Sequence, residues 1–216
     1  MPVRILSDSP SLFTQILAEL RNQKLQKDRQ RFRWNLKRAG FILAYEISRE
    51  LSYMQAEVTT PFGQALSHVL AEPPVLVSIL RAGNAFLEGA MEAFDFADVG
   101  FVAAYRTELT NREVQVKVDY LAVPSLKGRI VILMDPMLAT GRSILLSYEA
   151  IQLRGQPRLT FIMALIASEQ GMRMVQSKLP QAHLYVGAVD KELTARAYIV
   201  PGLGDAGDLA YGSLHS

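Results

Sequence analysis

An apolar run that ends in an acid and a turn of small residues is the part of the sequence best suited to chemistry. In VILMDPMLATGRS, the run 130–134 leads into Asp135 and then into the turn Ala139-Thr140-Gly141. The N–H groups of such a turn converge, and a following helix N-terminus adds positive potential, so the turn suits a phosphate monoester. Thr140 and Ser143 can add hydroxyl donors, and Ser143 is predicted to be the N-cap of that helix.

The acid before the turn suits a different role. An ionised Asp135 accepts hydrogen bonds only, so it can bind sugar hydroxyls or stand behind a magnesium ion, but not a phosphate. Pro136 has no N–H to donate and is expected to end the strand pairing. The lysine of the nucleoside-triphosphate loop G-x-x-x-x-G-K-[ST] is missing, which excludes that class of site. On pattern alone, a plain helix cap after a strand fits equally well.

Short apolar runs that alternate with helical segments predict the elements that position these residues. The expected strands cover 75–80, 99–104, 130–134, 159–167 and 184–189, and the expected helices cover 85–94, 143–154 and 169–178. This alternation predicts an α/β fold, a central and mostly parallel sheet flanked by helices. Such sheets bind ligands beyond the carboxyl ends of their strands, where Asp135 lies.

Two further elements are predicted outside this core. Apolar spacing over 36–51 predicts a long, largely buried helix, and the basic run 21–38 is interpreted as a solvated helix face rather than a nucleic-acid surface. Alternating valines at 114, 116 and 118 predict a β-hairpin arm over 105–120 with its tip near Thr110 to Arg112. Such an arm serves either as a mobile flap or as a dimer contact.

The composition argues against several classes of protein. The 216 residues suit one domain, and a net charge of +2 argues against a nucleic-acid partner. The chain has no cysteine for disulfides or thiolate zinc sites, and its 3 histidines lack ligand spacing. It shows neither a signal-peptide pattern nor an apolar stretch long enough for a bilayer, so we expect a cytoplasmic protein with no membrane partner.

The DPMLATGRS loop resembles the phosphoribosyl-pyrophosphate (PRPP) loop of the type I phosphoribosyltransferases, and its Asp-Pro form is similar to the uracil branch of that family. VSILRAGNAFLEGAM is similar to the family's first active-site loop, and YIVPGLGDAGDLAYGS resembles its C-terminal base-binding hood. The resemblance covers nearly the whole chain. It implies the type I phosphoribosyltransferase fold in a single domain, 1–216, with an N-terminal helical segment (about 11–53), a core (about 70–190) and the hood (about 191–216).

The resemblance also implies an activity and its residues. The family transfers the phosphoribosyl group of PRPP to uracil, giving UMP and pyrophosphate in pyrimidine salvage, with Mg²⁺ held mainly through PRPP and water. Four catalytic residues follow by motif match: Arg81 and Arg106 bind pyrophosphate, Asp135 binds ribose hydroxyls, and Asp205 orders the PRPP–magnesium end. The implied PRPP loop consists of Asp135, Pro136, Met137, Leu138, Ala139, Thr140, Gly141, Arg142 and Ser143. The implied uracil-binding backbone belongs to Ile199, Gly204, Asp205 and Ala206.

Several positions depart from the family pattern. Arg142 stands where a second glycine is usual, so its φ must be negative. Leu209 and Tyr211 replace an arginine and a phenylalanine, Thr107 and Glu108 replace Asp-Pro after Arg106, and the N-terminal Arg-x-Lys-x-Thr element is blurred. These departures keep two alternatives open: a non-catalytic relative that senses PRPP or a nucleotide, and a phosphoribosyltransferase for another base. A homodimer or higher homo-oligomer is expected.

Overall fold

The computed structural model describes residues 1–108 and 114–213, with side chains described outside 104–117. Its central sheet has the strand order β1-β10-β9-β7-β4-β5-β6, and the short β8 also pairs with β9. Every neighbouring pair is parallel except β5 with β6. The predicted α/β fold with a mostly parallel sheet is confirmed. The sheet strands are β1 (Val3–Ile5), β4 (Val75–Leu80), β5 (Asp98–Glu108), β6 (Val114–Ala122), β7 (Ile130–Met134), β8 (Met137–Leu138), β9 (Leu159–Ser168) and β10 (His183–Asp190).

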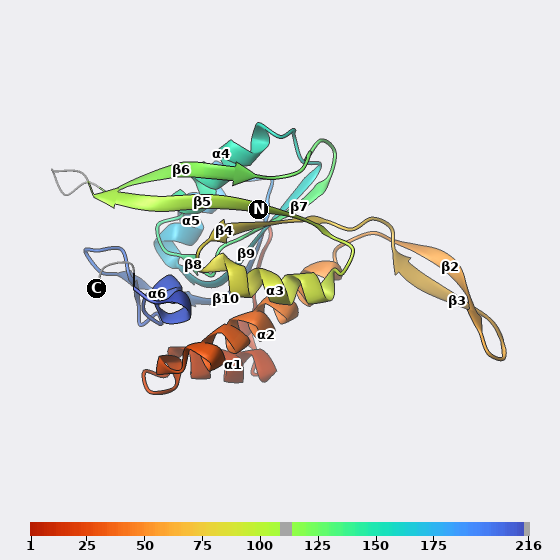
Figure 1. The fold of residues 1–216 in the computed structure, drawn as a ribbon, viewed down its shortest axis with the longest axis horizontal. Helices are drawn as coiled ribbons and strands as arrows, with labels where there is room; N and C mark the ends of the chain where they lie inside the picture. The colour runs from red at the N-terminus through yellow and green to blue at the C-terminus, as the bar shows by residue number, and fades with distance from the viewer. Residues whose placement is uncertain (109–113, 214–216) are drawn as a thin grey trace.

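Helices cover both faces of this sheet (Figure 1). Successive strand residues point to opposite faces: in β4, Leu76 joins the core cluster of α1, α2 and α3, whereas Val75 and Val77 join the cluster of α4 and α5. The helices are α1 (Leu12–Arg21), α2 (Arg29–Ser48), α3 (Gly83–Ala93), α4 (Arg142–Gln152), α5 (Glu169–Lys178) and α6 (Ala206–Tyr211), with short 3-10 turns η1 (Leu6–Asp8) and η2 (Leu25–Lys27). Each strand and helix that the sequence predicts is present; most ends shift by at most four residues, but the long helix predicted over 36–51 begins seven residues earlier, at Arg29.

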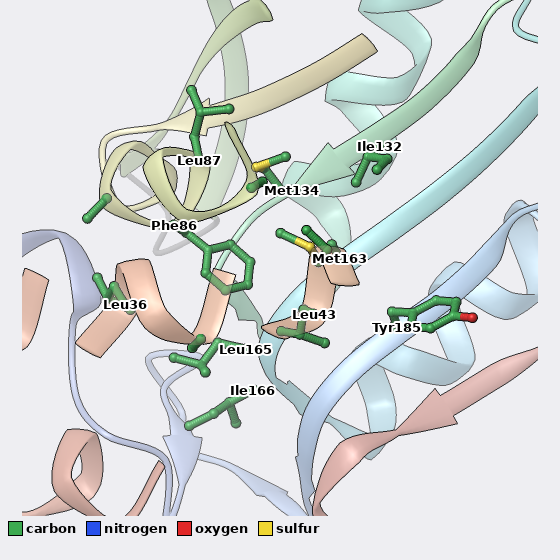
Figure 2. Packing of buried hydrophobic residues seen from close by; sticks show 14 of the residues in the cluster. Leu36, Leu43, Phe86, Leu87, Ile132, Met134, Met163, Leu165, Ile166 and Tyr185 are labelled. Atoms are coloured by element: carbon green, nitrogen blue, oxygen red, sulfur yellow. The ribbon is translucent and has the colours of Figure 1, made fainter. Parts of the chain in front are cut away.

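The predicted long buried helix is α2. Asp28 caps its N-terminus by accepting a hydrogen bond from the Arg31 N–H at 3.0 Å. Figure 2 shows Leu36 and Leu43 of this helix in the same cluster as Phe86 of α3 and Met163 of β9, all of them buried. Within the described ranges, no helix combines the length and the apolar character that crossing a membrane requires.

Two β-hairpins extend beyond the sheet. The predicted arm over 105–120 is confirmed as the antiparallel pair β5–β6, with a register shift after Ala103, while its predicted tip, Thr110 to Arg112, lies outside the described residues. The second hairpin, β2 (Tyr53–Thr60) with β3 (Gly63–Leu70), is not predicted from the sequence. It projects away from the rest of the molecule (Figure 1), and most of its residues are exposed, so it lacks the continuous apolar runs that mark the buried strands.

Candidate active site at the carboxyl edge of the sheet

The sequence predicts that strand pairing ends at Pro136, but the loop after β7 stays in the sheet. The Pro136 carbonyl accepts hydrogen bonds from the N–H groups of Leu165 (3.1 Å) and Ile166 (3.0 Å), and β8 then pairs with β9. The missing proline donor therefore interrupts the pairing without ending it, because the carbonyl still accepts. Asp135 occupies this interruption, where its Oδ1 accepts from the Met137 N–H at 3.1 Å.

The N-cap of α4 lies two residues earlier than predicted. The N-cap is Gly141, with a left-handed φ of 79°, so Ser143 lies inside the helix and its prediction as the cap is wrong. A Cβ at Gly141 would lie 3.1 Å from the Gly171 carbonyl oxygen of α5. Close packing of α5 and positive φ together require glycine here, which places the helix start at the following residue. Arg142 is that first helical residue, exposed and with the negative φ expected of it.

Arg81 follows β4 and contacts the C-terminal hood. The Leu80–Arg81 peptide is cis. The Arg81 Nη2 donates to Asp208 Oδ1 at 2.8 Å, and the Arg81 Nη1 donates to the Gly212 carbonyl at 3.1 Å. The half-buried guanidinium thus joins the strand end to the last helix of the chain.

The hood itself consists of β11 (Glu192–Leu193), β12 (Ile199–Val200), a turn with a cis Val200–Pro201 bond, and α6. Asp205 is the N-cap of α6 and accepts from the Asp208 N–H at 3.0 Å. Ile199 is buried in this hood. Arg33 of α2 donates to the Ala210 carbonyl at 2.7 Å and fixes the other end of α6.

A cavity of about 510 Å³ lies between the strand ends and the hood. Of the predicted site residues it brings together Arg81, Asp135, Met137, Ala139, Ser143, Ile199, Gly204, Asp205 and Ala206. Leu138, Thr140 and Gly141 line a small adjoining crevice, which shares Asp135, Met137, Ala139 and Ser143 with the cavity. Pro136 and Arg142 line neither space, and the Arg106 side chain lies outside the described part of the structure.

The cavity also contains residues that were not among the predicted site residues. Asp208 lines it and pairs with Arg81, and Tyr198 and Gly207 complete the hood side. Asp208 belongs to the hood motif PGLGDAGD, so its acid was visible in the sequence. Its pairing with Arg81 was not, because 127 positions separate the two residues.

A turn of small residues follows a central parallel strand and faces a hood across one cavity, and this fold and site are those of a phosphoribosyltransferase. The fold is shared with a solved hypoxanthine phosphoribosyltransferase from Staphylococcus aureus (14% identity, 74% of this chain and 76% of that chain, TM-score 0.51). The family model for uracil phosphoribosyltransferase matches residues 7–213. The chain belongs to the uracil phosphoribosyltransferase family.

Two relatives match over nearly their full lengths. A curated uracil phosphoribosyltransferase of Porphyromonas gingivalis is 39% identical, with 98% of this chain and 99% of that protein covered. The solved structure of the AQ2163 protein from Aquifex aeolicus is 34% identical, covers 97% of this chain and 98% of its own, and superimposes with a TM-score of 0.86. The similarity therefore includes the N-terminal helices and the hood as well as the sheet.

Proposed function

We propose that this protein, as a single domain, transfers the phosphoribosyl group of PRPP to uracil, giving UMP and pyrophosphate in pyrimidine salvage. The observation that carries the proposal is that one cavity holds both the turn after β7 and the glycine-rich hood. A phosphate-binding turn alone fits many nucleotide proteins. The opposed hood supplies a second, flat binding surface for the base that becomes attached to the sugar.

The sugar phosphate binds at the turn. Backbone N–H groups from Met137 to Ser143 surround the 5-phosphate, and the N-terminus of α4 adds positive potential. Asp135 lines the same cavity and accepts hydrogen bonds from the ribose hydroxyls. Holding the sugar on both sides stabilises the developing oxocarbenium character at the carbon that is attacked.

Uracil binds to the hood through backbone groups. A uracil ring presents alternating carbonyl and N–H groups along one edge, and backbone of Ile199, Gly204, Asp205 and Ala206 can pair with them. Cytosine would place an amino group against a backbone donor and leave both unpaired, which disfavours it.

Arg81 and Arg106 are proposed to bind the leaving pyrophosphate and to neutralise its growing charge. Within the described residues, no group of three or more acidic or histidine side chains could hold a metal by itself. Asp135 and Asp205 line the cavity and fit a Mg²⁺ ion that arrives with the diphosphate and water. When bound, Mg²⁺ supplies further neutralising charge at the leaving group.

A second proposal concerns the assembly. The β2–β3 pairs Met54–Val69, Ala56–Ser67 and Val58–Ala65 form one largely apolar hairpin face. Met54 (54%) and Val58 (42%) are exposed, and a two-stranded hairpin by itself is marginally stable in water. The same chain exposes an apolar stripe on α2, consisting of Trp34, Phe41 and Tyr45. Two apolar surfaces on one chain suit a twofold homodimer, which we propose.

The lack of cysteine supports our proposed cytoplasmic location, a reducing compartment.

The deciding experiment incubates purified protein with PRPP, Mg²⁺ and labelled uracil, and separates the products. UMP formation that needs all three components supports the enzyme. Clear PRPP binding by calorimetry without any UMP would overturn it in favour of a sensing relative. Product formed from another base but not from uracil would instead point to a different phosphoribosyltransferase.

A further inference from the structure

The hood holds the guanidinium of Arg81 at two points. Besides its ion pair to Asp208 at 2.8 Å, Arg81 donates at 3.1 Å to the carbonyl of Gly212, the C-cap residue that follows α6. The side chains of Arg81 and Asp208 are only partly exposed, 36% and 42%. The last helix of the chain therefore contacts the arginine near both of its ends.

Asp208 is itself fixed in place. Its backbone N–H donates to the Asp205 carboxylate at 3.0 Å. The neighbouring Gly207 packs close to the side chains of Asp205 and Arg81. A Cβ at Gly207 would lie 3.2 Å from Asp205 Oδ1 and 3.6 Å from Arg81 Nη2. Because its helix turn is constrained in this way, the Asp208 carboxylate can orient the flexible Arg81 side chain.

The two bonds to the hood leave donors for a ligand. A guanidinium carries five N–H groups, and the hood bonds use one on each terminal nitrogen. Arg81 also lines the cavity beside Asp135. An arginine that is already ordered loses less rotamer freedom when an anion binds, so anchoring raises affinity without any added contact.

We infer that Asp208 is a positioning residue, which with the Gly212 carbonyl holds the Arg81 guanidinium so that its remaining donors face the diphosphate of PRPP. Asp208 acts through Arg81 and does not touch the substrate. This inference rests on the proposed function, in which Arg81 binds the diphosphate.

The charge of Asp208 has an opposite effect, because a carboxylate near the diphosphate repels it. Two variants separate orientation from repulsion. Asp208→Asn keeps an oxygen acceptor for Arg81 and removes the charge, whereas Asp208→Ala removes both. Positioning predicts that only the alanine variant weakens PRPP binding. Repulsion predicts that both variants strengthen it.

The test measures kcat and the KM values for PRPP and uracil. We expect Asp208→Ala to raise the KM for PRPP roughly fivefold, the upper range for a partly exposed ion pair, and Asp208→Asn to change it less than about twofold. The matched control is Asp98→Ala, which removes another arginine–aspartate pair (Arg129, 3.0 Å) at the start of β5. It should leave every constant unchanged. If Asp208→Ala does not fold, Asp208→Ser, which also lacks the carboxylate, replaces it.

A double-mutant cycle with Arg81→Gln separates positioning from a general role of Asp208 in α6. PRPP affinity is measured by calorimetry. Because the Arg81→Gln protein keeps the phosphate turn, its weaker PRPP binding is measured at raised PRPP concentration. Positioning predicts that Asp208→Ala causes no further loss once Arg81 is replaced. An equal loss in both backgrounds, or a lowered KM in both Asp208 variants, would overturn the inference. Wild-type protein that makes no UMP would defeat the proposed function instead, and the binding cycle would still decide the role of Asp208.

Discussion

Arg21 and Asp190 form a double ion pair beside the hood turn at Gly202, with Nη1–Oδ2 and Nη2–Oδ1 both 2.8 Å. Both partners also hold the backbone of Gly202, whose N–H donates to Asp190 at 2.9 Å and whose carbonyl accepts from Arg21 at 3.0 Å. Gly202 has a φ of 54°, and a Cβ there would lie 2.1 Å from the Ile199 carbonyl. The ion pair thus sets the turn that presents the proposed uracil-binding backbone.

Arg21→Met is expected to destabilise the protein. It leaves the Asp190 carboxylate, only 8% exposed, without its cation, at a cost of about 3 kcal/mol. Urea unfolding measures the loss, and the KM for uracil should rise because the hood turn loosens. Adding Asp190→Asn removes the unpaired charge and should recover part of the stability. Arg173→Ala, which breaks an exposed helix pair, should change little, and an equal loss in that variant would contradict the argument.

Asp135→Asn is expected to lower kcat on the order of a hundredfold, because the amide no longer places a full negative charge beside the ribose. The Oδ1 that accepts from the Met137 N–H is retained, so the melting temperature should stay close to that of the wild type. Steady-state kinetics and thermal unfolding measure the two effects. Unchanged kcat would show that Asp135 does not bind the sugar.

Gly141→Ala is expected to damage the turn before α4, which we propose binds the phosphate. Alanine at a φ of 79° costs about 1–2 kcal/mol, and its Cβ would also press against the Gly171 carbonyl at 3.1 Å. Gly128→Ala is the matched control, since Gly128 has a similar φ of 70° but no atom within 4 Å of the added carbon. We expect the greater loss of stability and the rise in KM for PRPP at Gly141 only. Equal effects at both sites would mean that crowding by α5 contributes nothing.

Glu50 is expected to make stability depend on acid pH. Burial raises the pKa of Glu50, but hydrogen bonds from Tyr185 and His183 outweigh it and hold the pKa below the ordinary 4.5. A lowered folded pKa stabilises the protein above the unfolded value, and that stabilisation disappears as the pH falls through the folded pKa. Glu50→Gln should therefore cost stability at pH 7 but hardly at pH 3.

Because the Glu50 side chain is 40% exposed, we expect less than about 1 kcal/mol at pH 7. Denaturant titrations at several pH values measure the difference between wild type and variant. Glu57→Gln, on the exposed hairpin strand β2, serves as the control. A wild-type advantage that is equally large at pH 3 and pH 7 would exclude Glu50 as its source.

Val58→Asp is expected to dissociate the proposed dimer. It puts a charge on the apolar hairpin face, at the apolar pair nearest the hairpin tip, where Val58 is 42% exposed. Sedimentation velocity should show a wild-type dimer and a folded monomeric variant. Leu153→Asp, which alters an apolar side chain 83% exposed at the end of α4, should remain dimeric. A monomeric wild type, or a Val58→Asp dimer, would refute this assembly.

Much of the fold could be predicted because its elements depend on local sequence. The continuous apolar strand β7 and the helix α2 follow from residue spacing, which side-chain burial imposes along the chain. The β2–β3 hairpin could not be predicted in this way. Its strands bury no face against the sheet, so they lack the continuous apolar runs from which the core strands were predicted, although Met54, Ala56 and Val58 alternate along β2.

The sequence by itself determined the family-specific loops, since turn chemistry and the order of residues along 135–143 and 199–208 are local properties. Only the tertiary structure decided which of these residues meet. It brought Arg81 to Asp208, moved the N-cap from Ser143 to Gly141, and kept Pro136 within the pairing of β9. Such contacts depend on the packing of α5 and α6 against distant strand ends, and no spacing along the chain encodes that packing.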